Sequence, residues 1–317
     1  MLQYFTIKDY KQTNRLLRLW NNEFKNICPI RKQTFKTNII DDINLNKNAS
    51  FVALYDGQPV GFIFIKTWLT DSGFCNEENK AYISLIFVKK EMRNMGIGSD
   101  MLQLSIKEIK KHQNIKILEV GNDINNVLPG IPNEIPSSPV FFMNKGFIQK
   151  ESVVDMIRIV RNDAYEEVNN SDSDLKIRIA TEEDKDEILK LCIKNNWQRD
   201  AYLINSYFER GGTGRRIVVG EKDGKILAIA RIYEENKLAM KINIFMKDNN
   251  VGGILFLDID ESLQKEEYDK IMDDACKNYL IQRNCKKVIV PATKKIQYYK
   301  KLGYSAFKYY LRFDMEI

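Results

Sequence analysis

The sequence predicts a two-domain α/β protein. The chain has 317 residues, which is about twice the length of a common domain of roughly 150 residues. The order of strand-like and helix-like segments in residues 1–160 recurs after residue 175, an internal repeat of about 150 residues. In the first repeat, residues 81–112 form a strand, a glycine-containing loop and a helix. We therefore expect one α/β domain per repeat and the chemistry on residues 81–112.

Residues 81–112 change their hydrophobic pattern twice. AYISLIFV, residues 81–88, is an apolar run rich in β-branched and aromatic residues, which indicates a buried strand. A helix is indicated by apolar side chains at helical spacing: Met101, Leu102, Ile106 and Ile109. The loop between them reads Arg93, Asn94, Met95, Gly96, Ile97, Gly98 and Ser99.

This loop has the chemistry of an anion site. The first N–H groups of a helix lack internal partners and lie at the positive end of its dipole. Gly96 and Gly98 carry no side chain that would keep an anion away, and Arg93 adds positive charge. We expect a phosphate or pyrophosphate there. The alternative is that the glycines only form a tight turn. The loop lacks a third glycine in dinucleotide register and the GK[ST] of a P-loop.

The strand and loop resemble the acyl-CoA loop of the GNAT (GCN5-related) N-acetyltransferases. That family's signature, [QR]-x-x-G-x-[GA] after a strand ending in Val, is matched by Val88 and by Arg93 to Gly98. The resemblance covers residues 1–160. It implies α/β (α+β) domains of the GNAT type, each a mixed, mostly antiparallel sheet flanked by helices, with acetyl-CoA as acyl donor.

The other segments of the first half have the order expected from this resemblance. Strands are predicted at 2–7, 51–55, 60–65, 115–120 and 153–160, and helices at 10–24, 29–40 and 139–147. A Pro-rich insertion, Leu128 to Pro132, follows the strand that ends at Val120.

The resemblance also implies cofactor contacts. The pantetheine arm is expected along the backbone of Ile86, Phe87 and Val88, the pyrophosphate on Arg93 to Ser99, and Asn122 against cofactor or acceptor. Phe142 takes the place of the tyrosine that often protonates the departing thiolate in the family. Phenylalanine cannot donate a proton, so this acid is absent or lies elsewhere.

The family's mechanism is direct attack of an amine on the thioester, with a base or water taking the amine proton. Candidate catalytic residues are Glu78, with its neighbour Glu77, before the strand, and Asn122 and Asp123 after Val120. The alternative for each carboxylate is an ordinary solvated acid.

The second half repeats the order but not the loop. Strands are predicted at 175–180, 216–221, 226–233, 238–246, 254–259, 287–290 and 308–315, and helices from 182 and at 268–281. Its strand-to-helix loop, residues 261–269, has no glycine and carries Glu267 and Asp269, which would repel a pyrophosphate. Tyr299 takes the place of the family's acid tyrosine. We interpret this half as a degenerate GNAT-like domain without CoA binding, in which Tyr299 is structural.

These patterns predict three parts. Residues 1–162 form a CoA-binding acetyltransferase domain, 163–174 a polar linker and 175–317 the degenerate domain.

Charge, cysteine and histidine content and the lack of long apolar segments argue against several classes of protein. The net charge is +6, with 22 basic and 17 acidic residues up to Tyr165, which suits an anionic cofactor but is too small an excess to indicate nucleic acid. The five scattered cysteines and the single histidine favour reduced thiols and argue against a metal site. No membrane span or signal peptide is visible. We expect a cytoplasmic, bacterial protein, monomeric or homodimeric.

The predicted function is transfer of an acetyl group from acetyl-CoA to a primary amine of a small molecule. The Leu128 to Pro132 insertion and the segment Leu19 to Phe24 resemble tandem bacterial GNAT proteins, some of them similar to glucosamine N-acetyltransferases, which suggests an amino-sugar acceptor. Two alternatives stay open: a non-catalytic acetyl-CoA-binding or scaffold protein, and a protein N-acetyltransferase.

Overall fold

The structure is a computed structural model that describes residues 1–68, 73–74, 77–112, 114–160, 174–234, 250–263 and 266–317. The chain divides into two compact units. Unit 1 comprises Met1–Val153 and Lys308–Ile317, and unit 2 comprises Val154–Phe307. Each has a mixed, mostly antiparallel sheet flanked by helices, as predicted. No helix among the described residues is both long and apolar enough to cross a membrane.

The elements that begin in unit 1 follow the predicted order closely. In the first half of the chain they are β1 (Leu2–Thr6), α1 (Thr13–Phe24), α2 (Lys32–Phe35), the π-helical turn η1 (Lys36–Ile40), β2 (Phe51–Tyr55), β3 (Gln58–Thr67), β4 (Lys80–Val88), the 3-10 turn η3 (Lys90–Met92), α3 (Ile97–Ile109), β5 (Ile117–Val120), β6 (Ile131–Pro132), α4 (Ser137–Met143) and β7 (Ile148–Ile159).

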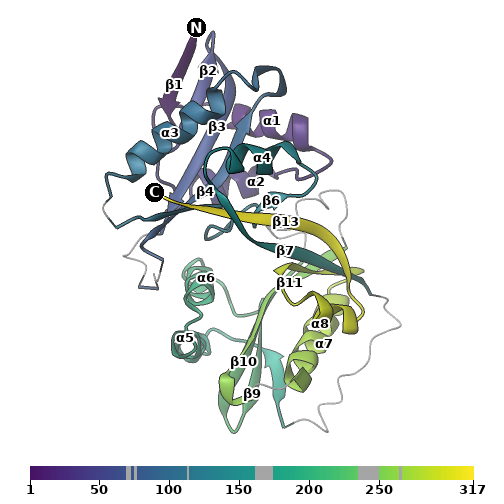
Figure 1. Ribbon diagram of the computed structural model, residues 1–317. Helices are drawn as coiled ribbons and strands as arrows, with labels where there is room; N and C mark the ends of the chain where they lie inside the picture. The colour runs from purple at the N-terminus through teal and green to yellow at the C-terminus, as the bar shows by residue number, and fades with distance from the viewer. Residues whose placement is uncertain (69–72, 75–76, 113, 161–173, 235–249, 264–265) are drawn as a thin grey trace. The chain divides into compact units, whose positions relative to one another are not determined.

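The sheet of unit 1 has the order β1-β2-β3-β4-β5-β13, where β13 (Ser305–Glu316) is the last strand of the chain. Neighbouring strands are antiparallel except for β4 and β5, which are parallel and are joined through α3. Helices cover both faces of this sheet (Figure 1).

Each face of the sheet has its own apolar core. On one face, Trp20 and Phe24 of α1 pack with Phe62 of β3 and Phe87 of β4. On the other, α3 and α4 bury apolar side chains against β3, β4 and β5: Ile97, Met101, Leu102, Ile109 and Phe142. A strand buried on both faces needs a continuous apolar run, and residues 81–88 are almost such a run.

Unit 2 repeats the arrangement. Its elements are β8 (Lys176–Ile179), α5 (Lys185–Lys194), α6 (Gln198–Glu209), β9 (Ile217–Lys222), β10 (Lys225–Glu234), β11 (Val251–Ile259), the 3-10 turn η8 (Glu261–Leu263), α7 (Glu266–Gln282), β12 (Lys287–Thr293) and α8 (Ile296–Lys301). The sheet order is β7-β12-β11-β10-β9-β8, with β11 and β12 parallel. Thus β11, α7 and β12 are the counterparts of β4, α3 and β5.

The two repeats exchange their last strands. From Val154 onward, β7 belongs to unit 2 and pairs with β12, whereas from Lys308 onward β13 belongs to unit 1 and pairs with β5. The predicted ranges 1–162 and 175–317 left each strand with its own repeat. Alternating hydrophobicity shows which face of a strand is buried but not which sheet edge it joins, and both last strands alternate in similar ways.

Two local differences concern the start of unit 2, and one prediction further along cannot be compared. The helix predicted from residue 182 begins at Lys185. Helix α6 was missed because its aromatic residues and Asn205 have low helix propensity, and burial of Ala201 and Ile204 outweighs this. The strand predicted at 238–246 lies outside the described residues.

Candidate functional site

The loop after β4 turns twice through the left-handed region before α3 begins. Asn94 has φ +62° and Gly96, which precedes the helix, has φ +84°. No side chain caps the N-terminus of α3. Because the first N–H groups of a helix have no internal acceptor, those of Ile97, Gly98 and Ser99 are available to an anion.

Gly98 has no side chain, so the backbone at the start of α3 stays accessible. A Cβ built on it would lie 3.4 Å from the ring of Phe141 and 3.5 Å from Val88, which is ordinary contact. A small side chain therefore fits at Gly98, and anything longer would extend past these neighbours. The glycine is required for access to the backbone rather than for the local conformation.

Strand β4 has an open backbone edge beside this loop. Its parallel pairing with β5 ends at Ile83 and Val120, after which the Gly121 N–H donates to the Ile83 carbonyl at 2.9 Å. Residues Ile86 to Val88 continue beyond this point and, among the residues that the structure describes, pair only with β3. Their outer backbone groups can receive an extended ligand as an added strand.

A pocket of about 240 Å³ connects the open edge to the start of α3. It is lined by Phe24, Ile86, Phe87, Val88, Met92, Arg93, Asn94, Gly96, Ile97, Gly98, Ser99, Ile135, Ser137, Ser138, Phe141 and Phe142. A smaller pocket of about 50 Å³ shares Ile86, Ser138 and Phe142 with it and reaches Ser84, Gly121 and Gly130, where β4 and β5 part. An extended molecule with an anionic part and a reactive end fits this shape.

Most of the predicted cofactor residues line the larger pocket. They are Ile86, Phe87, Val88, Arg93, Asn94, Gly96, Ile97, Gly98, Ser99 and Phe142. Met95 is 58% exposed and does not line either pocket, and neither does Asn122, whose side-chain amide donates to Glu119 at 2.8 Å.

Arg93 lines the pocket, but its guanidinium already makes contacts within the protein. Its Nε donates to the Val88 carbonyl at 3.0 Å, and its Nη2 pairs with Glu23 of α1. The positive charge expected to face an anion is thus partly neutralised by Glu23, and the Arg93 side chain also occupies one acceptor at the end of β4. The backbone N–H groups at the start of α3 are the other donors that could attract an anion here.

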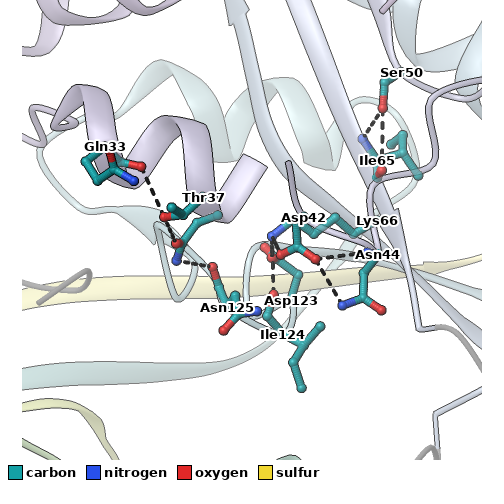
Figure 2. A network of polar contacts seen from close by, with 11 residues as sticks. Gln33, Thr37, Asp42, Asn44, Ser50, Ile65, Lys66, Asp123, Ile124 and Asn125 are labelled. Carbon is teal, nitrogen blue, oxygen red and sulfur yellow. Dashed lines mark hydrogen bonds and ion pairs between the residues drawn. The ribbon is translucent and has the colours of Figure 1, made fainter. Parts of the chain in front are cut away.

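The predicted catalytic residues do not converge. Glu78 is exposed in the turn before β4, whereas the pocket lies at the opposite end of that strand. Asp123 is 1% exposed and lines neither pocket. Its Oδ1 instead accepts from Nζ of the buried Lys66 at 2.5 Å (Figure 2).

The prediction missed the residues that close the pocket. Phe24 comes from α1, Ile135 and Ser138 flank the start of α4, and Ser84 is a hydroxyl inside an otherwise apolar strand. Ser84 could have been found from the sequence, because a single polar residue within a buried apolar run needs polar surroundings. The position of Ile135 and Ser138 depends on how the Pro-rich insertion folds back, which has no sequence signal.

The equivalent place in unit 2 is acidic. A pocket of about 410 Å³ is lined by Trp197, Leu257, Asp258, Ile259, Glu266, Asp269 and Lys295. Asp269 lies in the first turn of α7. The start of this helix therefore carries carboxylates, whereas the start of α3 in unit 1 has exposed N–H groups. Tyr299 is 7% exposed and packs between the rings of Tyr298 and Tyr304.

Asp258 makes the stability of unit 2 depend on pH. Burial, together with the Asp200 carboxylate that hydrogen-bonds it, raises the pKa of Asp258 to about 8. In the unfolded chain this carboxyl ionises near pH 4, so the folded state holds the extra proton between about pH 4 and 8. Stability should therefore fall by about 2 kcal/mol or more as pH rises from 5 to 8, and Asp258→Asn should make this slope smaller.

Urea unfolding at pH 5 and pH 8 measures the slope. Glu261→Gln is a matched control, because Glu261 is an exposed acid in the adjacent turn η8 and no change in slope is expected for it. Equal slopes for Asp258→Asn and the unsubstituted protein would contradict the assignment.

Comparisons with known proteins agree with this architecture. Residues 13–127 match the family model of the acetyltransferase (GNAT) family. No curated protein matches the sequence. Among solved structures, a GCN5-related glucosamine N-acetyltransferase region of a fungal multi-domain GH3 β-N-acetylglucosaminidase superposes with a TM-score of 0.82 at 15% identity. The alignment covers 99% of this chain, which spans 38% of the length of that fungal protein.

Two further structures are similar over nearly their whole length. A tandem GNAT protein from the clavulanic acid biosynthesis pathway has a TM-score of 0.67 at 12% identity, covering 100% of this chain and 98% of that one. A GCN5-related N-acetyltransferase from Sphaerobacter thermophilus has a TM-score of 0.69 at 10% identity, covering 99% and 95%. At these identities the likeness shows the fold alone.

Proposed function

We propose that unit 1 transfers an acetyl group from acetyl-CoA to a primary amine of a small molecule, because residues 13–127 match the model of the acetyltransferase (GNAT) family. The observation that carries this proposal is the pocket in which the open edge of β4 meets the uncapped N-terminus of α3. A protein that bound no acyl-CoA would need neither the open strand edge nor the uncapped helix.

The residues of the pocket fit the parts of acetyl-CoA. The N–H groups of Ile97, Gly98 and Ser99 would bind the pyrophosphate, and the backbone of Ile86 to Val88 would bind the pantetheine arm. The acetyl thioester supplies the activated acyl group. The small pocket between β4 and β5 would hold that end, where backbone N–H groups can stabilise charge that develops on the carbonyl oxygen.

Unit 2 would not bind the donor. Carboxylates of Glu266 and Asp269 lie at the pocket beside α7, where a pyrophosphate would meet like charge. Burial raises the pKa of Tyr299, and the nearby Asp273 carboxylate adds to this effect. A phenol held in its neutral form between two other rings is consistent with a structural role.

An amino sugar is the acceptor we favour. Support comes from the fungal glucosamine N-acetyltransferase region that this fold resembles and from the insertion Leu128 to Pro132, which brings Leu128, Ile131 and Pro132 to the small pocket. Unit 1 lacks an acidic groove along this pocket that would select basic peptides: all of its lining residues are uncharged except Arg93.

A non-catalytic acetyl-CoA-binding protein is the second candidate. Phe142 favours it, because this residue is 1% exposed, packs against Phe141 and Phe147, and offers no proton to a leaving thiolate.

Release of free thiol from acetyl-CoA separates the two candidates. The panel should contain glucosamine, other amino sugars, spermidine, amino acids and lysine peptides, with direct measurement of CoA binding alongside. We expect turnover with an amino sugar. Tight CoA binding without turnover of any amine would favour the binding protein, and turnover of peptides alone would favour a protein N-acetyltransferase.

A further inference from the structure

Ser84 occupies the point at which β4 and β5 separate. The register between β3 and β4 shifts here: Phe64 pairs with Leu85 and Ile65 with Ile83, which leaves Ser84 as the extra residue of a β-bulge. Bulges redirect a side chain locally, and Ser84, although only 2% exposed, lines the small pocket. A hydroxyl is thereby placed at the reactive end of the site.

Asp123 is brought behind this hydroxyl by a tight turn after β5. Gly121 and Asn122 both have positive φ, at +70° and +57°. A Cβ on Gly121 would lie 2.7 Å from the Gly130 backbone nitrogen, so the turn and the Pro-rich insertion touch directly. Two left-handed residues in succession turn the chain after β5, and Asp123, which follows them, is buried rather than exposed.

Lys66 anchors Asp123 there. Its ammonium is fully buried and contacts Asp123 Oδ1 at 2.5 Å, Asp42 Oδ2 at 3.1 Å and the Ile124 carbonyl at 3.2 Å (Figure 2). Asp42 is fixed in turn by the backbone and side-chain N–H groups of Asn44, at 2.9 and 3.1 Å. One oxygen of Asp123 is therefore held in a rigid position.

The charges of this network do not cancel. Two buried carboxylates share one ammonium, so ionisation of both leaves a net negative charge away from water. Burial would lower the pKa of Lys66, but the Asp123 and Asp42 carboxylates outweigh burial and raise it. Burial raises the pKa of Asp123, and the opposing effect of Lys66 does not cancel this. Asp123 is thus a stronger base than a solvated aspartate.

The second oxygen of Asp123 is available for a proton. Within the described part of the chain, neither Asp123 Oδ2 nor the Ser84 hydroxyl has a hydrogen-bond partner, and both are buried. The Ser84 hydroxyl is nonetheless close enough to favour the ionised form of Asp123. Ser84 thus influences the ionisation of Asp123 and also lines the small pocket.

We propose that Ser84 and Asp123 form the proton relay of the acetyl transfer, with Ser84 as the group that touches the acceptor amine and Lys66 and Asp42 as positioning residues. The proposal rests on the proposed function of unit 1 and gives that function the base and acid that the pocket otherwise lacks.

The step balances as follows. The amine nitrogen forms a bond to the acyl carbon, and the carbon–sulfur bond breaks with its electron pair leaving on sulfur. The amine proton passes to Ser84 Oγ while the Ser84 proton passes to Asp123 Oδ2. The same hydroxyl returns that proton to the sulfur, so the products are the amide and the free thiol. This return path replaces the hydroxyl that Phe142 does not have.

Ser84→Ala tests the relay, with Ser105→Ala as matched control. Ser105 is also a buried serine whose hydroxyl has no partner among the described residues, but it lies in α3 and lines neither pocket. With glucosamine, or the amine that turns over fastest, kcat should fall about 100-fold or more in Ser84→Ala. CoA affinity should stay within about twofold, and Ser84→Thr, which keeps the hydroxyl, should recover most of the rate.

The pH profile distinguishes a relay from a structural role. The profile of kcat/KM for the unsubstituted protein should have an acid limb above the ordinary range of aspartate, in addition to the limb from ionisation of the amine itself. Asp123 faces Lys66, Asp42 and the Ser84 hydroxyl. Ser84→Ala should lose this limb while the amine's own limb remains. Asp123→Asn should do the same if its fold survives the weakened contact with Lys66.

The outcomes distinguish a failure of the relay from a failure of the acetyltransferase proposal. If Ser84→Ala and Ser105→Ala both turn over at the unsubstituted rate with an unchanged pH profile, the relay is wrong and the acetyltransferase proposal stands. If the unsubstituted protein binds CoA but acetylates no amine in the panel, both are wrong.

Discussion

Replacing Gly98 with aspartate is expected to abolish CoA binding while leaving unit 1 folded. The new Cβ makes only ordinary contacts with Phe141 and Val88, and an acid in the first turn of a helix stabilises it by about 0.3–1 kcal/mol. The same carboxylate would lie at the N–H groups that we propose to bind the pyrophosphate. A repulsion of about 4 kcal/mol between unit charges 4 Å apart near a protein surface corresponds to a Kd raised by at least 100-fold.

Titration calorimetry with CoA gives this Kd, and two further variants make it interpretable. Gly98→Ala adds the Cβ without the charge and should weaken binding less than about tenfold. Ser262→Asp adds a carboxylate to the exposed turn before α7 in unit 2, and we expect no effect. Equal losses in Gly98→Asp and Ser262→Asp would contradict a single donor site in unit 1.

The second large effect concerns the last strand of the chain. Phe313 is fully buried in a core of unit 1 to which α3 also contributes, although the other buried residues of that core are more than 150 residues away and all lie before residue 154. Phe313→Ala should lower the free energy of unfolding of unit 1 by about 3–5 kcal/mol. Phe307, which is 38% exposed, provides the control, and Phe307→Ala should cost less than half as much.

Urea unfolding with and without CoA measures this effect and assigns it to a unit. CoA binds unit 1 under our proposal, so it should shift the transition that Phe313→Ala weakens. If the variant instead lowers only a transition that CoA leaves unchanged, Phe313 does not belong to the core of the donor-binding unit.

The strand, loop and helix of residues 81–112 could be predicted because their patterns are local. A buried strand, a pair of glycines and an amphipathic helix each have their own pattern, and nine of the residues named from this stretch line one pocket. Strand and helix bounds in the first half were accordingly close to those of the structure.

Features that depend on distant partners were not predictable. Asp123 follows a strand in the sequence, which is typical of a residue at a sheet edge, yet the left-handed turn at Gly121 and Asn122 buries it against Lys66. Nothing in the neighbourhood of Arg93 indicates Glu23, which is 70 residues away. A lone lysine in β3 gives no sign of the two carboxylates that surround it.

Strand exchange also determines when unit 1 can be completed during protein synthesis. Residues 1–153 leave the ribosome long before Lys308–Ile317 exist, and until then β5 has an open edge and the cavity for Phe313 is unfilled. The whole of unit 2 must be translated in between. The half without the proposed donor site therefore cannot be deleted through to the end of the chain without removing the strand that completes the other half.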